Sequence, residues 1–578
     1  MKRFAFAAAI VFALGLVLWA AAGLSAPSPD PAKLMPDGAL LYIQAKDFQG
    51  LLKDWDSSVE KRTWLKGDNY AAFSRSRLFD RLSQAQGEFS TAATLPTDEN
   101  LLNSVAGQMS AIALYDIGNL EFVYVTRMDE GKAQATPLWS VRDKFEQRTE
   151  GNATFYVHQD LQSNRTAAFA VRDGWLILGT RADLVAGVLD RLQGAQAHSL
   201  PDEAWYADAV KQAKGPADDL RMVINLEKAV PSPYFRSYWV QRNITEMKQY
   251  RSALCDLHRA NQEYREDRSL LRKAGTATAP AGDINGLLVM APEDAVFSSA
   301  VSSPAPDGIL DELRENIVDL KPERAQMAWT APGAVVQQGA GSSSDFETRI
   351  DEAPVLVTQT DPYQPLRAML GAAQPTGMLK VFETHEAEDG VFTRIDRAIA
   401  LQSKAPWNAT TIESSLSTAI RPGLTASQLG VEWNQRSVPG GSYFALNGAV
   451  PMFFAIHRNS LLLSTSESLL QALLSRADQA ASSPAQGVTY AAVFRHSQRE
   501  QRNLRNIVAR LDSAGPVSRD RQSGEDNGEP ATGQAPHFFS GNMESLSRTF
   551  ANVSQESIEE KDQGDLVTQT VRYQWKRQ

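Results

Sequence analysis

Short apolar runs followed by amphipathic helical patterns recur along this chain. Residues 169–191 (FAVRDGWLILGTRADLVAGVLDR) align without a gap with residues 454–476 (FAIHRNSLLLSTSESLLQALLSR). Each segment predicts a buried strand and then a helix, because consecutive apolar residues give way to apolar residues at helical spacing. The matching Thr180 and Thr465 precede the helices, and Thr180 with Asp183 and Ser464 with Glu467 are typical of helix N-caps. The repeat indicates duplication of a fold unit.

The runs between and around these segments predict strands joined by short turns. Strands are expected at 110–115 and 120–127, with the turn Asp116-Ile117-Gly118-Asn119 between them. A further hairpin is expected at 552–575, turning at 562–565. Strand pairs separated by single helices favour an α+β fold in which each unit is a mainly antiparallel sheet with helices packed on one face.

Two similar strand starts mark the boundaries of the units. Pro36-Asp37-Gly38-Ala39-Leu40 and Pro292-Glu293-Asp294-Ala295-Val296 both place a turn before an apolar run. We therefore expect one unit over 35–290 and a second over 291–578. Two segments depart from the repeat: a long helix is expected at 234–273, from heptad-like spacing of apolar residues, and a disordered loop at 513–535, from its Gly, Pro, Ser and charged residues.

The N-terminus has the pattern of an export signal. Lys2 and Arg3 precede an uncharged apolar stretch, and residues 1–26 are expected to be a signal peptide or an N-terminal membrane anchor. Residues 4–26 are long enough to cross a bilayer, so a released form and a tethered form both remain open. We expect the remainder of the chain to face the periplasm.

Composition limits the partners of this chain. Its formal net charge is −10, which disfavours binding to nucleic acid or to anionic lipid. We expect membrane contact only through the N-terminal segment. Cys255 is the one cysteine, so no internal disulfide can form, and a packing role is expected for it.

Motifs that carry chemistry are missing from the sequence. It has no Gly-x-Ser-x-Gly elbow, no phosphate-binding loop with Lys-Ser or Lys-Thr, and no His-Glu-x-x-His. Its seven histidines do not fall at metal-ligand spacing. We therefore expect no catalytic residues, no cofactor and no metal, and a protein that is not an enzyme.

One aromatic cluster is the best candidate for recognition. On a helix, Phe235 and Trp239 would form one stripe and Tyr234 and Tyr238 another. Such a cluster either packs on the sheet or docks a protein partner, because Tyr and Trp are enriched at binding anchors.

Three segments carry a resemblance to known sequences: PDGALLY at 36–42, ALYDIGNLEFVYVTR at 113–127 and SPYFRSYWVQRNITEMKQY at 232–250. Together they resemble a family of uncharacterised bacterial exported proteins, which implies a place in the cell envelope and no known active residues. The expected function is a noncatalytic envelope scaffold or interaction module. A carrier for an apolar ligand and a hydrolase with a dispersed site are the alternatives, and the oligomeric state stays open.

Overall fold

A computed structural model describes residues 30–66, 68–233, 247–276, 282, 284–319, 361–385, 394–420, 431–438, 440–447, 451–481, 487–497 and 553–575. The expected export signal at 1–26 and the expected loop at 513–535 lie outside these residues. The chain divides into two compact units. Unit 1 comprises Met1–Lys61, Phe73–His258 and Arg268–Lys273, and unit 2 comprises Arg62–Ala72, Arg259–Asp267 and Ala274–Gln578. Each unit is described by itself.

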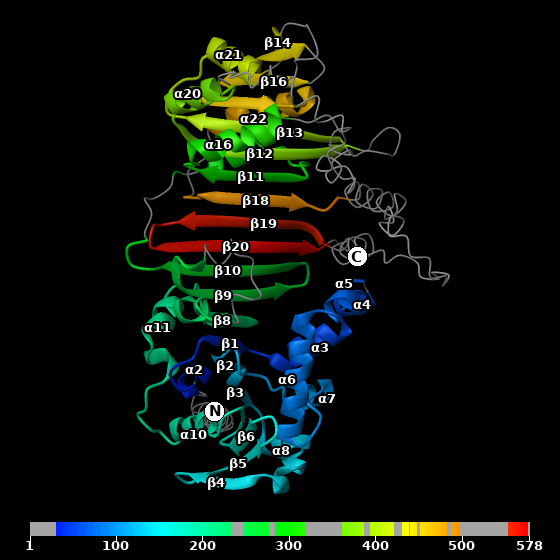
Figure 1. Cartoon of the computed structure of the whole chain (residues 1–578), viewed down its shortest axis with the longest axis vertical. Coiled ribbons are helices and arrows are strands. Elements are labelled where there is room, and N and C mark those ends of the chain that lie inside the picture. The colour runs from blue at the N-terminus through cyan, green and yellow to red at the C-terminus, as the bar shows by residue number, and fades with distance from the viewer. Residues whose placement is uncertain are drawn as a thin grey trace, which may run out of the picture. The chain divides into compact units, whose positions relative to one another are not determined.

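Helices and strands alternate through the first half of the chain (Figure 1). In order, the described elements are α2 (Pro31–Leu34), β1 (Leu41–Ala45), α3 (Phe48–Ser57), α4 (Val59–Lys66), α5 (Asp68–Phe73), α6 (Arg77–Ala93), α7 (Glu99–Val105), β2 (Ser110–Asp116), β3 (Glu121–Arg127), α8 (Glu130–Gln134), α9 (Pro137–Ser140), η1 (Arg142–Lys144), β4 (Glu146–Glu150), β5 (Ala153–Asp160), β6 (Arg165–Arg172), β7 (Trp175–Gly179), α10 (Ala182–Leu192), η2 (Leu200–Asp202), α11 (Ala204–Val210), β8 (Leu220–Asn225), α12 (Leu226–Ala229), β9 (Tyr250–Ala260) and β10 (Glu263–Arg272).

Unit 1 contains an antiparallel sheet in the order β9-β8-β1-β2-β3-β7-β6-β5-β4. The first strand in the chain is therefore internal: Leu41 of β1 faces Leu114 of β2 on one side and Ile224 of β8 on the other. The predicted hairpin at 110–127 is confirmed as β2 and β3. Helix α10 packs against β6 and β7, the strands that precede it.

Unit 2 has a comparable succession of elements. They are α15 (Asn285–Met290), β11 (Phe297–Ser302), α16 (Pro306–Leu313), the π-helical turn η3 (Arg314–Val318), α20 (Gln364–Ala373), β12 (Pro375–His385), β13 (Arg394–Ser403), α21 (Ala409–Ile420), β14 (Glu432–Val438), β15 (Gly441–Asn447), β16 (Met452–His457), β17 (Ser460–Ser464), α22 (Glu467–Ala481), β18 (Tyr490–Arg495), β19 (Val553–Asp562) and β20 (Leu566–Trp575).

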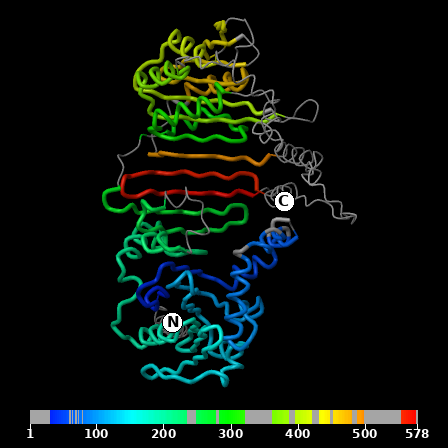
Figure 2. The backbone as a smooth tube through the Cα atoms, viewed as in Figure 1, coloured from blue at the N-terminus to red at the C-terminus, as the bar shows by residue number. Residues whose placement is uncertain are grey.

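The sheet of unit 2 is also antiparallel, in the order β20-β19-β18-β11-β12-β13-β17-β16-β15-β14. Strand β11 lies between β12 and β18, as β1 lies between β2 and β8. Figure 2 shows the tube of the β19–β20 hairpin in red, and this hairpin confirms the one predicted at 552–575.

Helices cover both faces of the sheet in unit 2, so the expectation of helices on one face is wrong there. Ala398 and Ala400 of β13 face a cluster that includes α15 and α22, whereas the intervening Ile399 and Leu401 face a cluster that includes α16, α20 and α21. The physical reason is visible in β13 itself. Its run Ala-Ile-Ala-Leu is apolar at consecutive positions, which buries both sides of a strand.

The expected long helix at 234–273 is also wrong for its described part. Residues 250–260 and 263–272 form the paired strands β9 and β10, with a turn at 261–262. The alternation of apolar and polar residues that predicts a strand is missing from the sequence of β9 and β10, because polar residues occupy several buried positions. On β9 these are Ser252 and Asp256, on either side of the buried Leu254. Residues 234–246 lie outside the described part of the chain.

The threonines that precede the repeated helices bind neighbouring strands and do not cap the helices. Thr180 Oγ1 accepts from the backbone N–H of Phe122 at 2.8 Å, and the Thr180 N–H donates to the Phe122 carbonyl oxygen at 3.0 Å. Thr465 makes the same pair of bonds with Arg397, each at 2.9 Å.

The caps expected at Thr180 and Ser464 are therefore wrong. The Thr180 hydroxyl binds β3, and Ser464 Oγ donates to the Arg397 carbonyl oxygen of β13 at 3.0 Å and accepts from the Ser466 N–H at 3.0 Å. The hydroxyl that accepts from the first turn of α22 is that of Ser466, bonded by the Leu469 N–H at 3.5 Å.

Candidate functional site

The aromatic cluster predicted from the sequence is not tested by the structure. Tyr234, Phe235, Tyr238 and Trp239 lie outside the residues that the structure describes. The candidate site described below is formed instead by three helices of unit 1 that lie between β1 and β2 in the chain.

Helix α3 is amphipathic but has no buried residue. Phe48, Leu51, Leu52 and Trp55 recur at the spacing of one helical face. Asp47 begins the helix, since its carboxylate accepts from the Gly50 N–H at 2.9 Å. At the other end, the Trp55 side chain is 48% exposed. The apolar stripe that the sequence directs toward a core is thus left partly in solvent.

Helices α6 and α7 each carry a further exposed leucine. Leu82 of α6 is 47% exposed and Leu102 of α7 is 42% exposed. The two helices are held together just before α7 begins, because Gln86 Nε2 donates to the Thr97 carbonyl oxygen at 2.7 Å. Trp55, Leu82 and Leu102 are called the helical surface below.

Lys61 connects α3 to α7. Its Nζ lies 2.6 Å from Asp56 Oδ1 and 2.5 Å from Glu99 Oε1. Asp56 follows Trp55 directly, and Glu99 is one helical turn before Leu102. The hydrogen bond to Asp56 raises the pKa of Lys61, and the hydrogen bond from Lys61 lowers the pKa of Asp56. The two carboxylates at this bridge are therefore within one helical turn of Trp55 and Leu102 along α3 and α7.

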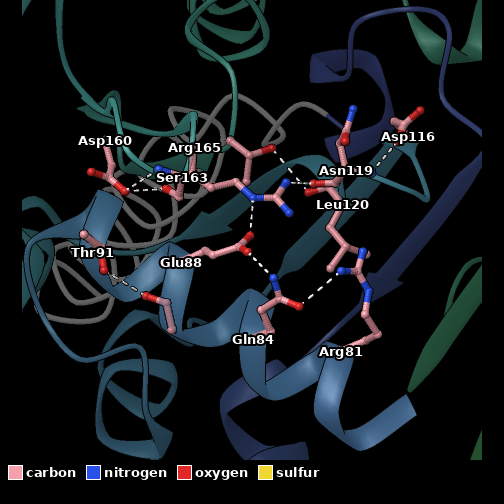
Figure 3. A network of polar contacts seen from close by, with 12 residues as sticks. Arg81, Gln84, Glu88, Thr91, Asp116, Asn119, Leu120, Asp160, Ser163 and Arg165 are labelled. Atoms are coloured by element: carbon pink, nitrogen blue, oxygen red, sulfur yellow. Dashed lines mark hydrogen bonds and ion pairs between the residues drawn. The ribbon is translucent and has the colours of Figure 1, made fainter. Parts of the chain in front are cut away.

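A second polar network attaches α6 to the sheet (Figure 3). Arg81 Nη1 donates to Gln84 Oε1 at 3.2 Å, and Gln84 Nε2 donates to Glu88 Oε1 at 2.9 Å. Glu88 in turn accepts from Arg165 Nε of β6 at 2.8 Å. That bond holds the pKa of the Glu88 carboxyl below its ordinary value. The Arg165 guanidinium also lies over the Phe89 ring, 5.2 Å from its centroid. This network fixes α6 in place without covering Leu82.

The helices in the corresponding position of unit 2 bury their apolar residues. They lie between β11 and β12, as α3, α6 and α7 lie between β1 and β2. Ile309 and Leu313 of α16 and Leu366 of α20 are each 0% exposed and pack in one cluster with Ile399 of β13. The exposure of the helical surface is thus a property of unit 1 and not of this position in the fold.

Groups suited to metal chemistry do not gather in the described ranges. No cluster of three or more His, Cys, Asp or Glu side chains there could hold a metal ion. Cys255, expected on a helix, lies on β9 opposite Met222 of β8 and is partly buried. Within the same ranges, no helix combines the length and the apolar character that a membrane crossing needs.

The sequence missed the helical surface because a helical stripe of apolar residues ordinarily predicts burial. The available signal was the stripe Phe48, Leu51, Leu52 and Trp55, which is followed by the charged segment 56–62 and not by another apolar element. No sequence pattern distinguished Leu82 and Leu102 from core leucines.

No protein-family model and no curated protein matches this chain. Among solved structures, crystal form I of TP0453 matches with 11% sequence identity and a TM-score of 0.24, covering 44% of this chain and 82% of that one. Crystal form III of TP0453 matches with 12% identity and a TM-score of 0.24, covering 46% and 86%. At this TM-score, neither likeness carries an argument about this chain.

Proposed function

We propose that this chain is a noncatalytic exported envelope protein that binds another protein through the helical surface of unit 1. The observation that carries the proposal is the contrast between the units. In the described ranges, helices α16 and α20 between β11 and β12 bury their apolar residues, whereas the helices between β1 and β2 leave Trp55, Leu82 and Leu102 between 42% and 48% exposed. Apolar side chains that are exposed together are typical of binding surfaces, and the bonds of Lys61 to Asp56 and Glu99 tie the end of α3 that carries Trp55 to the start of α7, the helix that carries Leu102.

The chemistry around the helical surface favours a protein partner. Tryptophan is enriched at interface anchors, and protein interfaces combine an apolar centre with a polar rim. The bridge of Asp56, Lys61 and Glu99 supplies such a rim. The net charge of −10 disfavours nucleic acid and anionic lipid as alternatives.

Export to the envelope rests on the N-terminal sequence. Lys2 and Arg3 before the apolar residues 4–26 support translocation of the remainder of the chain, either released or tethered to the inner membrane. The resemblance to bacterial exported proteins supports the same location. We infer that the partner is therefore met on the periplasmic side.

We also infer that the two units arose by duplication. In support, the nine strands from β9 to β4 in unit 1 have the same order as the nine from β19 to β14 in unit 2, and Thr180 and Thr465 bind Phe122 and Arg397 in the same way. Asp173 and Arg458, at matching positions of the repeat, both have positive φ, at 50° and 52°. In an experimental structure, the Cα atoms of 169–191 and 454–476 should overlay within about 3 Å, a distance below one helical turn. A different order of strand and helix in either segment would contradict the inference.

Site-specific photo-crosslinking in cells tests the proposed binding. A benzophenone amino acid at Leu102 should give an adduct with a second protein, and the same group at Trp55 should give the same adduct. Leu161, in the turn after β5, is the matched control because it is an apolar residue of unit 1 that is 87% exposed. A probe at Leu161 should give no such adduct.

The variant Trp55→Ser with Leu102→Ser should abolish the adduct formed from a probe at Leu82. It should lower the thermal unfolding temperature of the purified protein only slightly, because Trp55 and Leu102 are already 48% and 42% exposed. Adducts of equal yield from Leu102 and Leu161, or an adduct with twice the mass of the chain alone, would contradict the proposal of a distinct protein partner.

A further inference from the structure

A polar cavity of about 550 Å³ lies in unit 1, at the end of α10 and beside α2. It is bordered by the segment 194–202, which includes His198 and Asp202, and by the cationic side chains of Lys33 and Arg191. The helical surface contributes none of its lining, so the cavity is independent of the function proposed above.

Arg191 is the central group of this cavity, and its charge has no carboxylate partner among the described residues. Its Nη1 donates to the Gly187 carbonyl oxygen at 2.6 Å, and its Nη2 donates to the carbonyl oxygen of His198. A guanidinium has five N–H donors, so each terminal nitrogen keeps one N–H beyond these bonds. Its Nε is buried and has no hydrogen-bond partner within the described ranges. The protein therefore positions this cation without a carboxylate in direct contact, although the charge of Asp202 acts on it at longer range.

The matching arginine of unit 2 does have a carboxylate beside it. Arg476 occupies the same position of the repeat as Arg191. Its Nε donates to the Val289 carbonyl oxygen at 2.9 Å, and its Nη2 lies 3.6 Å from Glu293 Oε1. Both arginines thus hold backbone carbonyl groups, but only Arg476 is paired with an acid among the described residues.

The other charged groups leave the cavity positive on balance. Lys33, in the last turn of α2, is exposed and makes no ion pair within the described part of the chain. Asp202 is the opposing charge. Its Oδ2 accepts from the backbone N–H of Ser199 at 2.9 Å and from Ser199 Oγ at 2.8 Å, and the backbone bond is the main cause of its lowered pKa. Asp202 is thus committed to the turn before η2, whereas Arg191 and Lys33 face the cavity.

We propose that this cavity binds a carboxylate, with Arg191 as the main ligand-binding residue and Lys33 as a second positive charge. An arginine fork matches the two oxygens of a carboxylate, and the matching Arg476 has a carboxylate near it, with Glu293 Oε1 3.6 Å from its Nη2. The carboxylate belongs either to a small organic acid or to the C-terminus of a peptide. The cavity is large enough for several non-hydrogen atoms beyond the carboxylate itself.

Ligand-observed NMR on the full chain tests this site with three probes: succinate, trialanine with a free C-terminus, and trialanine amide. Binding of succinate alone assigns the site to small organic acids. Binding of the free-acid peptide but not of its amide assigns it to a peptide C-terminus. Equal binding of acid and amide, or no binding of any probe, overturns the proposal.

The matched variants are Arg191→Gln and Arg476→Gln. Arg191→Gln should weaken binding of the positive probe at least about tenfold, whereas Arg476→Gln should leave it unchanged. Lys33→Gln should also weaken binding. Because Lys33 makes no ion pair within the described residues, this variant should fold normally and can replace Arg191→Gln if the latter unfolds. Binding that survives both Arg191→Gln and Lys33→Gln overturns the proposal.

Discussion

Glu88 is the carboxylate whose position most directly links charge to stability in unit 1. Its side chain is 23% exposed and that of Arg165 is 18% exposed, so solvent screens this pair less than a surface pair. The Arg165 hydrogen bond lowers the pKa of Glu88 from its ordinary value of 4.5. Folding therefore favours the ionised form of Glu88. The contribution of this carboxylate to the unfolding free energy is complete above pH 4.5 and is lost as the pH falls through the lowered pKa of the folded state.

The variant Glu88→Gln should be less stable than the parent chain by about 1 kcal/mol at pH 7. The difference should stay constant down to about pH 5 and shrink at lower pH, as the parent carboxyl becomes protonated. Urea unfolding at a series of pH values measures this. Glu146→Gln is the control, because Glu146 pairs with Arg148 in solvent and its loss should change little. A difference that persists unchanged into acid would contradict the assignment.

Polar residues in buried positions are where the sequence was misleading at the residue scale. Asp256 is 4% exposed and Arg221 is 6% exposed, and their side chains form two bonds of 2.7 Å between β9 and β8. An Asp and an Arg that lie 35 positions apart along the chain give no pattern that predicts their pairing. The hydrophobic rule correctly placed Leu254 in the interior, but it assigned the surrounding residues to a helix.

At the scale of the element, β9 depends on that buried pair. Asp256→Leu should destabilise unit 1 by about 3–5 kcal/mol, because it leaves the Arg221 guanidinium buried without its partner. The double variant Arg221→Met with Asp256→Leu should recover most of the loss, since it removes both charges. A double-mutant cycle by urea unfolding measures the coupling between the two residues.

The control for β9 is Asp218→Asn, which alters the partly exposed contact between Asp218 and His258. It should change the unfolding free energy far less than Asp256→Leu. If the double variant were as unstable as the single variant, the loss would come from strand packing and not from the unpaired charge.

The elements that the sequence predicted correctly are those with local, apolar signals. The β2–β3 hairpin and the strand and helix of each repeat segment have uninterrupted apolar runs and recognisable turns. Positions of the helices relative to the sheet were not local information. In unit 2, Ala398 and Ile399 lie on opposite faces of β13, and helices pack on both faces. The sequence shows that both residues are apolar, but it does not show whether a helix covers each face.

At the scale of the whole molecule, the charge of the N-terminus predicts the topology of the chain. A reporter that is active only in the periplasm should be active when fused after Gln578, and a reporter that is active only in the cytoplasm should be inactive there. The reason is that Lys2 and Arg3 are expected to keep the N-terminal end in the cytoplasm while the rest of the chain is translocated. Fusion of both a periplasmic and a cytoplasmic reporter, assayed in parallel, measures this. Deleting residues 2–26 should exchange the two activities, and cytoplasmic activity of the intact chain would contradict export.

The candidate site could not be located from the sequence. A protein-binding surface was expected, but it was assigned to Tyr234, Phe235, Tyr238 and Trp239, which the structure does not describe. The helical surface could be recognised only by comparing exposure at the same position of the two units. Whether a helix is buried depends on which other elements pack against it, and the sequence of α3 alone does not show this.

The internal position of β1 has a consequence for the order of synthesis. Leu41–Ala45 is made first, yet it needs both Ser110–Asp116 and Leu220–Asn225 as neighbours. On the ribosome, this strand must wait with at least one unpaired edge until most of unit 1 has been translated, and such edges invite aggregation. β11 waits in the same way for β18. Late closure of this kind suits a polypeptide that is held unfolded by chaperones and threaded through a translocon before it folds.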